Sequence, residues 1–156
     1  MNKLKTQAEI IKIVNALKQR GKIIVTTNGT FDLLHVGHVR TLEASKKYGD
    51  VLIVGLNSDK SVKSYKGNNR PINNEKYRAE MLSALACVDY VVLFDEPDPR
   101  KLLEKIKPDV HTNLETYGEH CVEAATMKKN GGRLVLLPVI DGYSTTDLIK
   151  KIKKFF

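Results

Sequence analysis

The sequence predicts a single α/β domain in which helices cover both faces of a doubly wound, Rossmann-like parallel sheet. Short apolar runs at residues 23–25 and 51–56 lack the polar alternation of a sheet with one solvent-exposed face. Helix-length segments separate these runs, a pattern typical of parallel strands joined by crossover helices. No internal repeat, low-complexity segment or Pro/Gly-rich linker marks a second domain. We therefore expect residues 1–156 to form one domain, with a leading helix over 1–21 and an α/β core over 22–156.

The elements follow from local signals along the chain. Thr6 and Glu9 have the spacing of a capping box, and Ile10, Val14 and Leu17 then recur at helical intervals. The first strand is expected next, followed by a helix that begins at two histidines. The strands are predicted at 22–27, 51–56, 90–94, 109–112 and 133–138, and the later helices at 74–86, 99–107, 118–129 and 145–154.

Composition narrows the class of protein and of partner. The 42% apolar and 28% charged residues are ordinary for a globular protein, and the net charge of +8 favours anionic partners. Nucleic acid, acidic lipid and phosphorylated small molecules are all anionic, so the net charge alone does not choose among them. No apolar run approaches the roughly 20 residues that cross a bilayer, and residues 1–20 lack a signal-peptide core. Two cysteines are too few for a disulfide framework, so we expect a cytoplasmic protein.

A pair of histidines follows the first predicted strand. Ligands of doubly wound sheets bind beyond the carboxyl ends of the strands, so the loop after this strand is the expected site. His35 and His38 stand three residues apart at a helix start, where free N–H groups and the helix dipole attract phosphate. Gly37 would let a phosphate approach the backbone. This arrangement predicts a triphosphate site.

The two histidines allow two other interpretations. A lone histidine is more often a helix cap or a core residue, but here the turn, the position and the spacing occur together. Two histidines at this spacing can also chelate zinc, yet Asp32 is the only acidic or cysteine ligand nearby. We therefore predict no metal ligands among the protein side chains.

Residues 29–38 read Gly-Thr-Phe-Asp-Leu-Leu-His-Val-Gly-His, which resembles the signature of the cytidylyltransferase-like nucleotidyltransferases. Further matches run through Gly-Leu-Asn-Ser-Asp at 55–59 and Arg-Pro-Ile-Asn at 70–73 to Gly-Tyr-Ser-Thr-Thr at 142–146. This longer pattern, over residues 20–152, most resembles the D-glycero-β-D-manno-heptose 1-phosphate adenylyltransferases. The resemblance implies transfer of a nucleoside monophosphate from ATP, or from CTP, to a sugar phosphate such as heptose 1-phosphate, with release of pyrophosphate. The charge of the triphosphate predicts Mg²⁺ as its companion ion, because the sequence shows no dedicated carboxylate cage. The resemblance also implies a homodimer.

The resemblance assigns roles residue by residue. It gives catalysis to His35, His38, Lys46 and Arg78; nucleotide binding to Thr30, Phe31, His35, Gly37, His38, Asn57, Lys66, Arg78, Ser144, Thr145 and Thr146; and contact with the phosphorylated substrate to Asp32, Lys46 and Arg70. The residues alone leave other roles open: Lys46 as a solvated helix lysine, Lys66 in a surface turn, Arg78 in a surface ion pair and Ser144 as a helix cap. Because some relatives carry a fused kinase domain, we expect a separate protein to make the acceptor.

The resemblance weakens at residues 108–117. Where the heptose family has a Val-Lys-Gly-Gly-Asp-Tyr-like segment, only Tyr117 of this chain matches, which leaves the acceptor open. His111, His120 and Cys121 are expected to pack or to lie on the surface. We expect the last helix to dock on the sheet through Ile149 and Ile152.

Three alternative functions remain. A glycerol-3-phosphate cytidylyltransferase shares the opening motif, although the Lys66-Gly67 and Arg70-Pro71 pairs argue against it. A basic nucleic-acid-binding module would explain the charge, but no aromatic-interleaved basic surface is present, so no nucleic-acid partner is expected. Lysines and Phe155 in the last helix would suit a membrane surface, although we expect no membrane partner.

Overall fold

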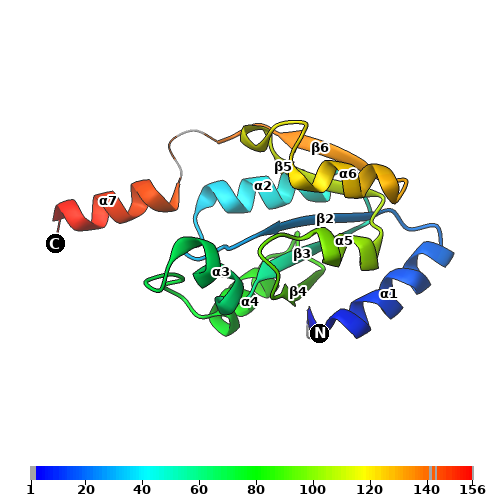
Figure 1. Cartoon of the computed structure of the whole chain (residues 1–156), viewed down its shortest axis with the longest axis horizontal. Helices are drawn as coiled ribbons and strands as arrows, with labels where there is room; N and C mark the ends of the chain where they lie inside the picture. Colours follow the sequence, from blue (N-terminus) through cyan, green and yellow to red (C-terminus); the bar gives the residue numbers. More distant parts are fainter. Residues whose placement is uncertain (1–2, 141, 143, 156) are drawn as a thin grey trace.

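A six-stranded sheet forms the centre of the molecule, and every pairing in it is parallel. The computed structural model describes residues 3–140, 142 and 144–155. The strand order is β1-β4-β3-β2-β5-β6, so the order reverses between β2 and β5 (Figure 1). This confirms the doubly wound α/β prediction. The strands are β1 Leu4–Lys5, β2 Ile24–Gly29, β3 Val51–Asn57, β4 Tyr90–Phe94, β5 Val110–Leu114 and β6 Arg133–Leu137.

Helices cover both faces of the sheet. Helices α1, α5 and α6 pack on one face, and α2 and α4 pack on the other. No helix in the described part of the chain is long and apolar enough to cross a membrane. The helices are α1 Gln7–Gln19, α2 Val36–Lys46, α3 Asp59–Lys66, α4 Glu75–Ala84, α5 Arg100–Ile106, α6 Val122–Lys129 and α7 Thr145–Phe155, with a 3₁₀ turn η1 Glu115–Tyr117.

Strand β3 explains why the apolar runs lack polar alternation. Leu52 and Val54 belong to the core cluster under α2 and α4, whereas Val51 and Ile53 belong to the cluster under α1 and α5. Successive side chains point to opposite faces of a strand, and here both faces are buried. Positions 51–56 of the strand are therefore apolar or glycine, and only Asn57 at its carboxyl end is polar.

The leading segment is an integral part of the core. Helix α1 begins at the predicted capping box, in which Thr6 and Glu9 hydrogen-bond reciprocally. Ile10 and Val14 are fully buried against the sheet. The preceding strand β1 pairs with β4, although two residues were too few for its prediction from sequence.

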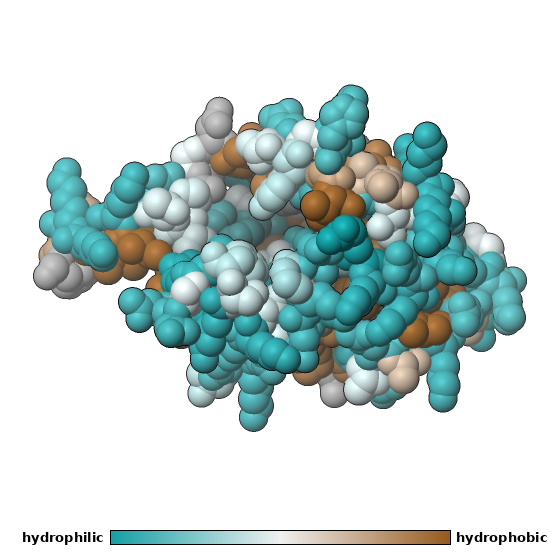
Figure 2. Space-filling model, in the orientation of Figure 1, coloured by the Kyte–Doolittle hydropathy of each residue, from teal (hydrophilic) through white to brown (hydrophobic). Residues whose placement is uncertain are grey.

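Helix α7 does not dock on the sheet, so that expectation was wrong. None of its residues is buried, and Ile152 is 48% exposed. The helix projects from the body of the molecule, with apolar side chains lying between its lysines (Figure 1, Figure 2). Amphipathic spacing predicts that a helix face will be covered, but it does not say by which surface.

Candidate active site

A pocket of about 470 Å³ opens at the carboxyl ends of β2, β3 and β5. It therefore lies at the point where the strand order reverses, as the sequence predicts. The loop after β2 forms its floor, and η1, α6 and the start of α7 contribute to its walls. The pocket brings together these predicted site residues: Thr30, Phe31, Asp32, His38, Asn57, Lys66, Arg70 and Thr145.

The backbone after β2 takes an unusual path at Phe31. This residue has φ 47°, in the left-handed region that a bulky side chain rarely adopts. Its ring is buried, lies 5.2 Å from the ring of His38, and passes so close to Gly29 that a Cβ there would be 3.0 Å from it. Strained backbone of this kind concentrates at functional sites. The Gly29–Phe31 turn thus fixes the floor of the pocket beside His38.

His35 and His38 form a stacked pair at the start of α2. Their ring centroids are 3.8 Å apart, and the backbone N–H of His35 donates to Nδ1 of His38 at 3.4 Å. Since Nδ1 accepts this bond, the proton of a neutral His38 ring belongs on Nε2. Burial, with smaller contributions from His35 and Lys66, lowers the pKa of His38 to about 4. His38 is therefore a neutral hydrogen-bond donor in the pocket wall at neutral pH.

His35 supports this arrangement from outside the pocket lining. Its Nδ1 is buried and has no hydrogen-bond partner among the described residues, and burial lowers its pKa. Gly37 is buried in the first turn of α2, where its carbonyl accepts from Thr41. We therefore place His35 and Gly37 at the helix start that borders the pocket.

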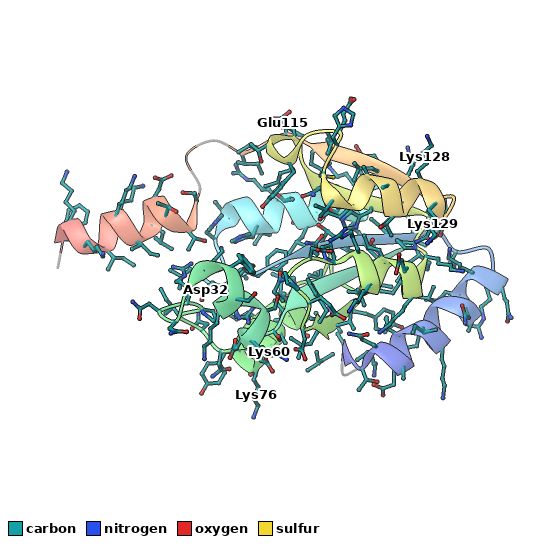
Figure 3. The ribbon with its side chains drawn as sticks, viewed as in Figure 1. Asp32, Lys60, Lys76, Glu115, Lys128 and Lys129 are labelled. Carbon is teal, nitrogen blue, oxygen red and sulfur yellow. The ribbon has the colours of Figure 1, made fainter. Side chains whose placement is uncertain are left out.

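Asp32 organises one rim of the pocket. It is 2% exposed and accepts from the backbone N–H groups of Ile72 and Asn73 at 2.8 and 2.9 Å. The Nε atom of Arg70 lies 2.9 Å from the second carboxylate oxygen, as an ion pair without hydrogen-bond alignment. Figure 3 shows Asp32 beside the segment that joins α3 to α4, which contains Arg70, Ile72 and Asn73. Asp32 therefore holds Arg70 at the pocket rather than presenting a free carboxylate.

Lys66 adds a second positive charge near Arg70. Burial chiefly lowers the pKa of Lys66, helped by Arg70 and opposed by Asp32. In contrast, Lys60, Lys76, Lys128 and Lys129 point outward from three helices (Figure 3). The excess positive charge of the chain is therefore spread over the surface, and only part of it faces the pocket.

Arg78 is a correction to the predicted site. Its side chain is fully buried and does not line the pocket. Its nitrogens donate to the carbonyls of Asn73 and Thr30 at 3.0 and 2.6 Å and to the carboxylate of Asp59 at 2.7 Å. These contacts place it beneath the loop after β2, where it holds the Thr30 carbonyl and is set back from the pocket surface.

Lys46 is the second correction. Its ammonium donates to the Asp89 carboxylate and to the Asp50 carbonyl. Asp50 and Asp89 immediately precede β3 and β4, so this ion pair lies at the amino ends of the strands. Eight helical residues separate Lys46 from His38 by about 12 Å along the axis. The lysine therefore lies at the end of the sheet opposite the pocket.

The start of α7 meets the pocket only in part. Ser144 caps the helix, because its hydroxyl accepts from the Asp147 N–H at 3.0 Å. Thr145 lines the pocket, whereas Thr146 is exposed. Tyr143 of the same motif lies outside the described residues.

Several pocket residues were missed in the sequence. Tyr65 donates to or accepts from Thr30 at 2.6 Å, and Tyr117 of η1 also lines the pocket. Asn28, Asp98 and Glu123 complete the polar wall. Asp98 and Glu123 lie beside a helix start, a position that many structural residues share, whereas Asn28 lies within β2 and Tyr65 near the end of α3, where no sequence pattern marks them.

The divergent segment places its histidines apart. His111 is fully buried in β5, with Nδ1 2.8 Å from the Thr26 hydroxyl, and burial lowers its pKa to about 3. His120 is exposed and Cys121 is half-buried. Packing and surface roles are thus confirmed. Among the described residues, no group of three His, Cys, Asp or Glu side chains could hold a metal ion.

A parallel sheet with a pocket at its switch point, a histidine pair at a helix start and two facing cations defines a nucleotidyltransferase site. The family model described as Cytidylyltransferase-like matches residues 26–151, and the chain belongs to this family.

Known proteins resemble the chain over almost its full length. The "Bifunctional protein HldE" of Geobacter metallireducens is 48% identical over 155 residues, and that of Aliarcobacter butzleri is 48% identical over 151 residues. These matches cover 99% and 97% of this chain but only 32% and 31% of the relatives. The chain thus spans about a third of their length. A crystal structure of the lipopolysaccharide core biosynthesis protein from Thermoplasma volcanium is 34% identical, with a TM-score of 0.63, over 80% of this chain and 100% of that one.

Proposed function

We propose that this domain transfers the adenylyl group of ATP to a heptose 1-phosphate, releasing pyrophosphate. The observation that carries the proposal is the switch-point pocket in which His38 faces Lys66 and Arg70. The names of the relatives and the longer sequence resemblance support a sugar phosphate of lipopolysaccharide synthesis as the acceptor.

In this mechanism the chain supplies positions and charge rather than a covalent intermediate. A phosphate oxygen of the acceptor attacks the α-phosphorus of ATP, and the bond from that phosphorus to the departing pyrophosphate breaks. His38 donates a hydrogen bond to a phosphate oxygen, and the free N–H groups at the start of α2 share in stabilising the charge. Lys66 and Arg70 attract the phosphates at the opposite rim.

Magnesium would enter with the triphosphate. Mg²⁺ commonly binds through substrate phosphates and water, which fits a described chain that offers no cluster of three ligands. When bound, it would neutralise phosphate charge.

We also propose a cytoplasmic location and a homodimer; sedimentation of the purified chain tests the latter.

Pyrophosphate release tests the reaction. ATP and CTP are each combined with heptose 1-phosphate and with glycerol 3-phosphate, in the presence of Mg²⁺. We expect turnover with ATP and heptose 1-phosphate. Turnover only with CTP and glycerol 3-phosphate would favour the alternative enzyme, and no release in any combination would contradict the proposed acceptors.

A further inference from the structure

Tyr65 links two parts of the pocket that the proposed reaction uses. It stands in the last turn of α3, lines the pocket and is 48% exposed. Its hydroxyl lies 2.6 Å from Oγ1 of Thr30, in the loop after β2. The ammonium of its neighbour Lys66 lies over its ring, with Nζ 5.8 Å from the ring centroid. The tyrosine therefore joins the pocket floor to one of the pocket cations.

The contact with Thr30 fixes the orientation of the ring. Thr30 is itself held, because its carbonyl accepts from Nη1 of Arg78 at 2.6 Å. Burial raises the pKa of Tyr65, so the phenol stays protonated at neutral pH and can donate to or accept from this threonine. A tyrosine side chain has only two torsions, so a bond at its far end leaves the ring little freedom. The ring is thus a fixed surface in the pocket wall.

Lys66 has no close anionic partner to hold it. No carboxylate oxygen among the described residues lies within 4 Å of its ammonium. Asp32 attracts it only from farther away, because Arg70 takes the near side of that carboxylate. A lysine side chain is flexible, whereas an aromatic face attracts a cation within about 6 Å of the ring centroid. Tyr65 therefore restricts where Lys66 places its charge.

The charge of Lys66 is directed at the same space as His38. Both residues line the pocket, and Lys66 contributes to the lowered pKa of His38, after the larger effects of burial and of His35. A phosphate that accepts a hydrogen bond from His38 is therefore also attracted by Lys66. Under the proposed function, on which this inference rests, that phosphate belongs to the nucleoside triphosphate.

We propose that Tyr65 is a positioning residue that holds Lys66 against the triphosphate. Thr30 orients the ring, and the ring orients the ammonium. Tyr65 needs no contact with the reacting phosphorus in this role, so its effect on the nucleotide disappears when the ammonium is removed. A cation–π contact at an exposed site corresponds to a roughly 2- to 5-fold change in affinity.

A double-mutant cycle on ATP binding, measured by calorimetry without an acceptor, tests this role. Tyr65→Leu should weaken binding at least about fivefold, because the contact and the orientation of the ammonium are both lost. Lys66→Met should weaken it at least about tenfold, and adding Tyr65→Leu to Lys66→Met should cost less than about twofold more. Tyr77→Leu removes an exposed tyrosine of α4 outside the pocket and should leave the affinity unchanged.

Thermal melting confirms that each variant is folded, and Tyr65→Met, which keeps an unbranched apolar side chain, replaces Tyr65→Leu if the latter is not. Unchanged affinity in the folded Tyr65 variant, or an equal loss with and without Lys66, would overturn the positioning role. The predicted coupling without pyrophosphate release in any substrate combination would leave this role standing and contradict the proposed reaction. No binding of ATP or CTP by the wild-type chain would overturn both.

Discussion

At the scale of single residues, two histidines are neutral for the same physical reason but have different functions. Burial lowers the pKa of both His38 and His111, so both rings are neutral at pH 7. His38 lines the pocket and can donate to a ligand, whereas His111 is enclosed in β5 and bonds to Thr26. Position relative to the pocket, rather than protonation, separates a binding residue from a core residue.

His111 predicts a loss of stability in acid. Its pKa is about 3 in the folded chain, against about 6.5 in a solvated state, so only the unfolded chain takes up this proton between those values. The free energy of unfolding should therefore fall as pH drops below about 6.5, by about 1.4 kcal/mol per pH unit. Urea unfolding at pH 7.5 and pH 5.0 measures the effect.

The matched variants are His111→Leu and His120→Leu. Wild-type protein should lose about 2 kcal/mol more than His111→Leu between these pH values, because leucine binds no proton. His120→Leu changes an exposed side chain and should behave as the wild type. Equal pH dependence in wild type and His111→Leu would refute the interpretation.

Part of the site could be predicted from the residues because they occur together in one short segment. Thr30, Phe31, Asp32 and His38 follow a strand and open a helix, and all four line the pocket. In contrast, the pattern around Glu123 is the same whether a glutamate faces solvent or a cavity. Arg78 was misassigned because only packing between segments 48 residues apart buries it under Thr30.

At the scale of elements, α3 shows the limit of local patterns. Residues 59–66 contain only two apolar or aromatic residues, Val62 and Tyr65, and the sequence predicts no helix there, with a surface turn as one interpretation of Lys66. The structure has a helix there, capped by the Ser58 hydroxyl, which accepts from the Ser61 N–H at 3.1 Å. Only Val62 packs as an apolar core residue, so tertiary contacts and the cap stabilise a helix that has too few apolar residues to be predicted.

Arg78 joins α4 to the loop after β2, and its removal should loosen the pocket floor. Arg78→Leu leaves the Thr30 and Asn73 carbonyls without these donors, and leaves Asp59 without its cation. We expect a loss of about 3 kcal/mol in the free energy of unfolding, measured with urea. Lys76→Leu on the exposed side of the same helix should cost less than about 0.5 kcal/mol. Equal stability of the two variants would contradict this structural role.

For Lys46, at the carboxyl end of α2, we predict only small effects on stability and activity, in contrast to Arg78. Lys46→Met removes a partly exposed ion pair at the end of α2 far from the pocket. Stability should fall by no more than about 1 kcal/mol, and kcat/KM for pyrophosphate release should stay within about twofold of wild type. A hundredfold loss of kcat/KM in folded Lys46→Met would return this lysine to the catalytic set.

At the scale of the whole molecule, the sheet and the position of the pocket could be predicted, but the path of α7 could not. Two-sided burial of β3 follows from its composition, and the switch point between β2 and β5 follows from parallel crossovers. The apolar residues of α7 indicate a covered face, yet no described part of the same chain buries them. The direction in which α7 leaves the domain depends on contacts between distant parts of the chain, which the local sequence of the helix does not determine.

The central claim is that nucleotidyl transfer occurs at the histidine pair where the strand order reverses. The direct test is kcat/KM for pyrophosphate release by His38→Ala, with whichever substrate pair gives turnover in the wild type, and with His120→Ala as an exposed control. We predict a loss of at least about 100-fold in folded His38→Ala, or roughly 2.7 kcal/mol of transition-state stabilisation, and little change in the control. Near-full turnover by His38→Ala would place the chemistry elsewhere.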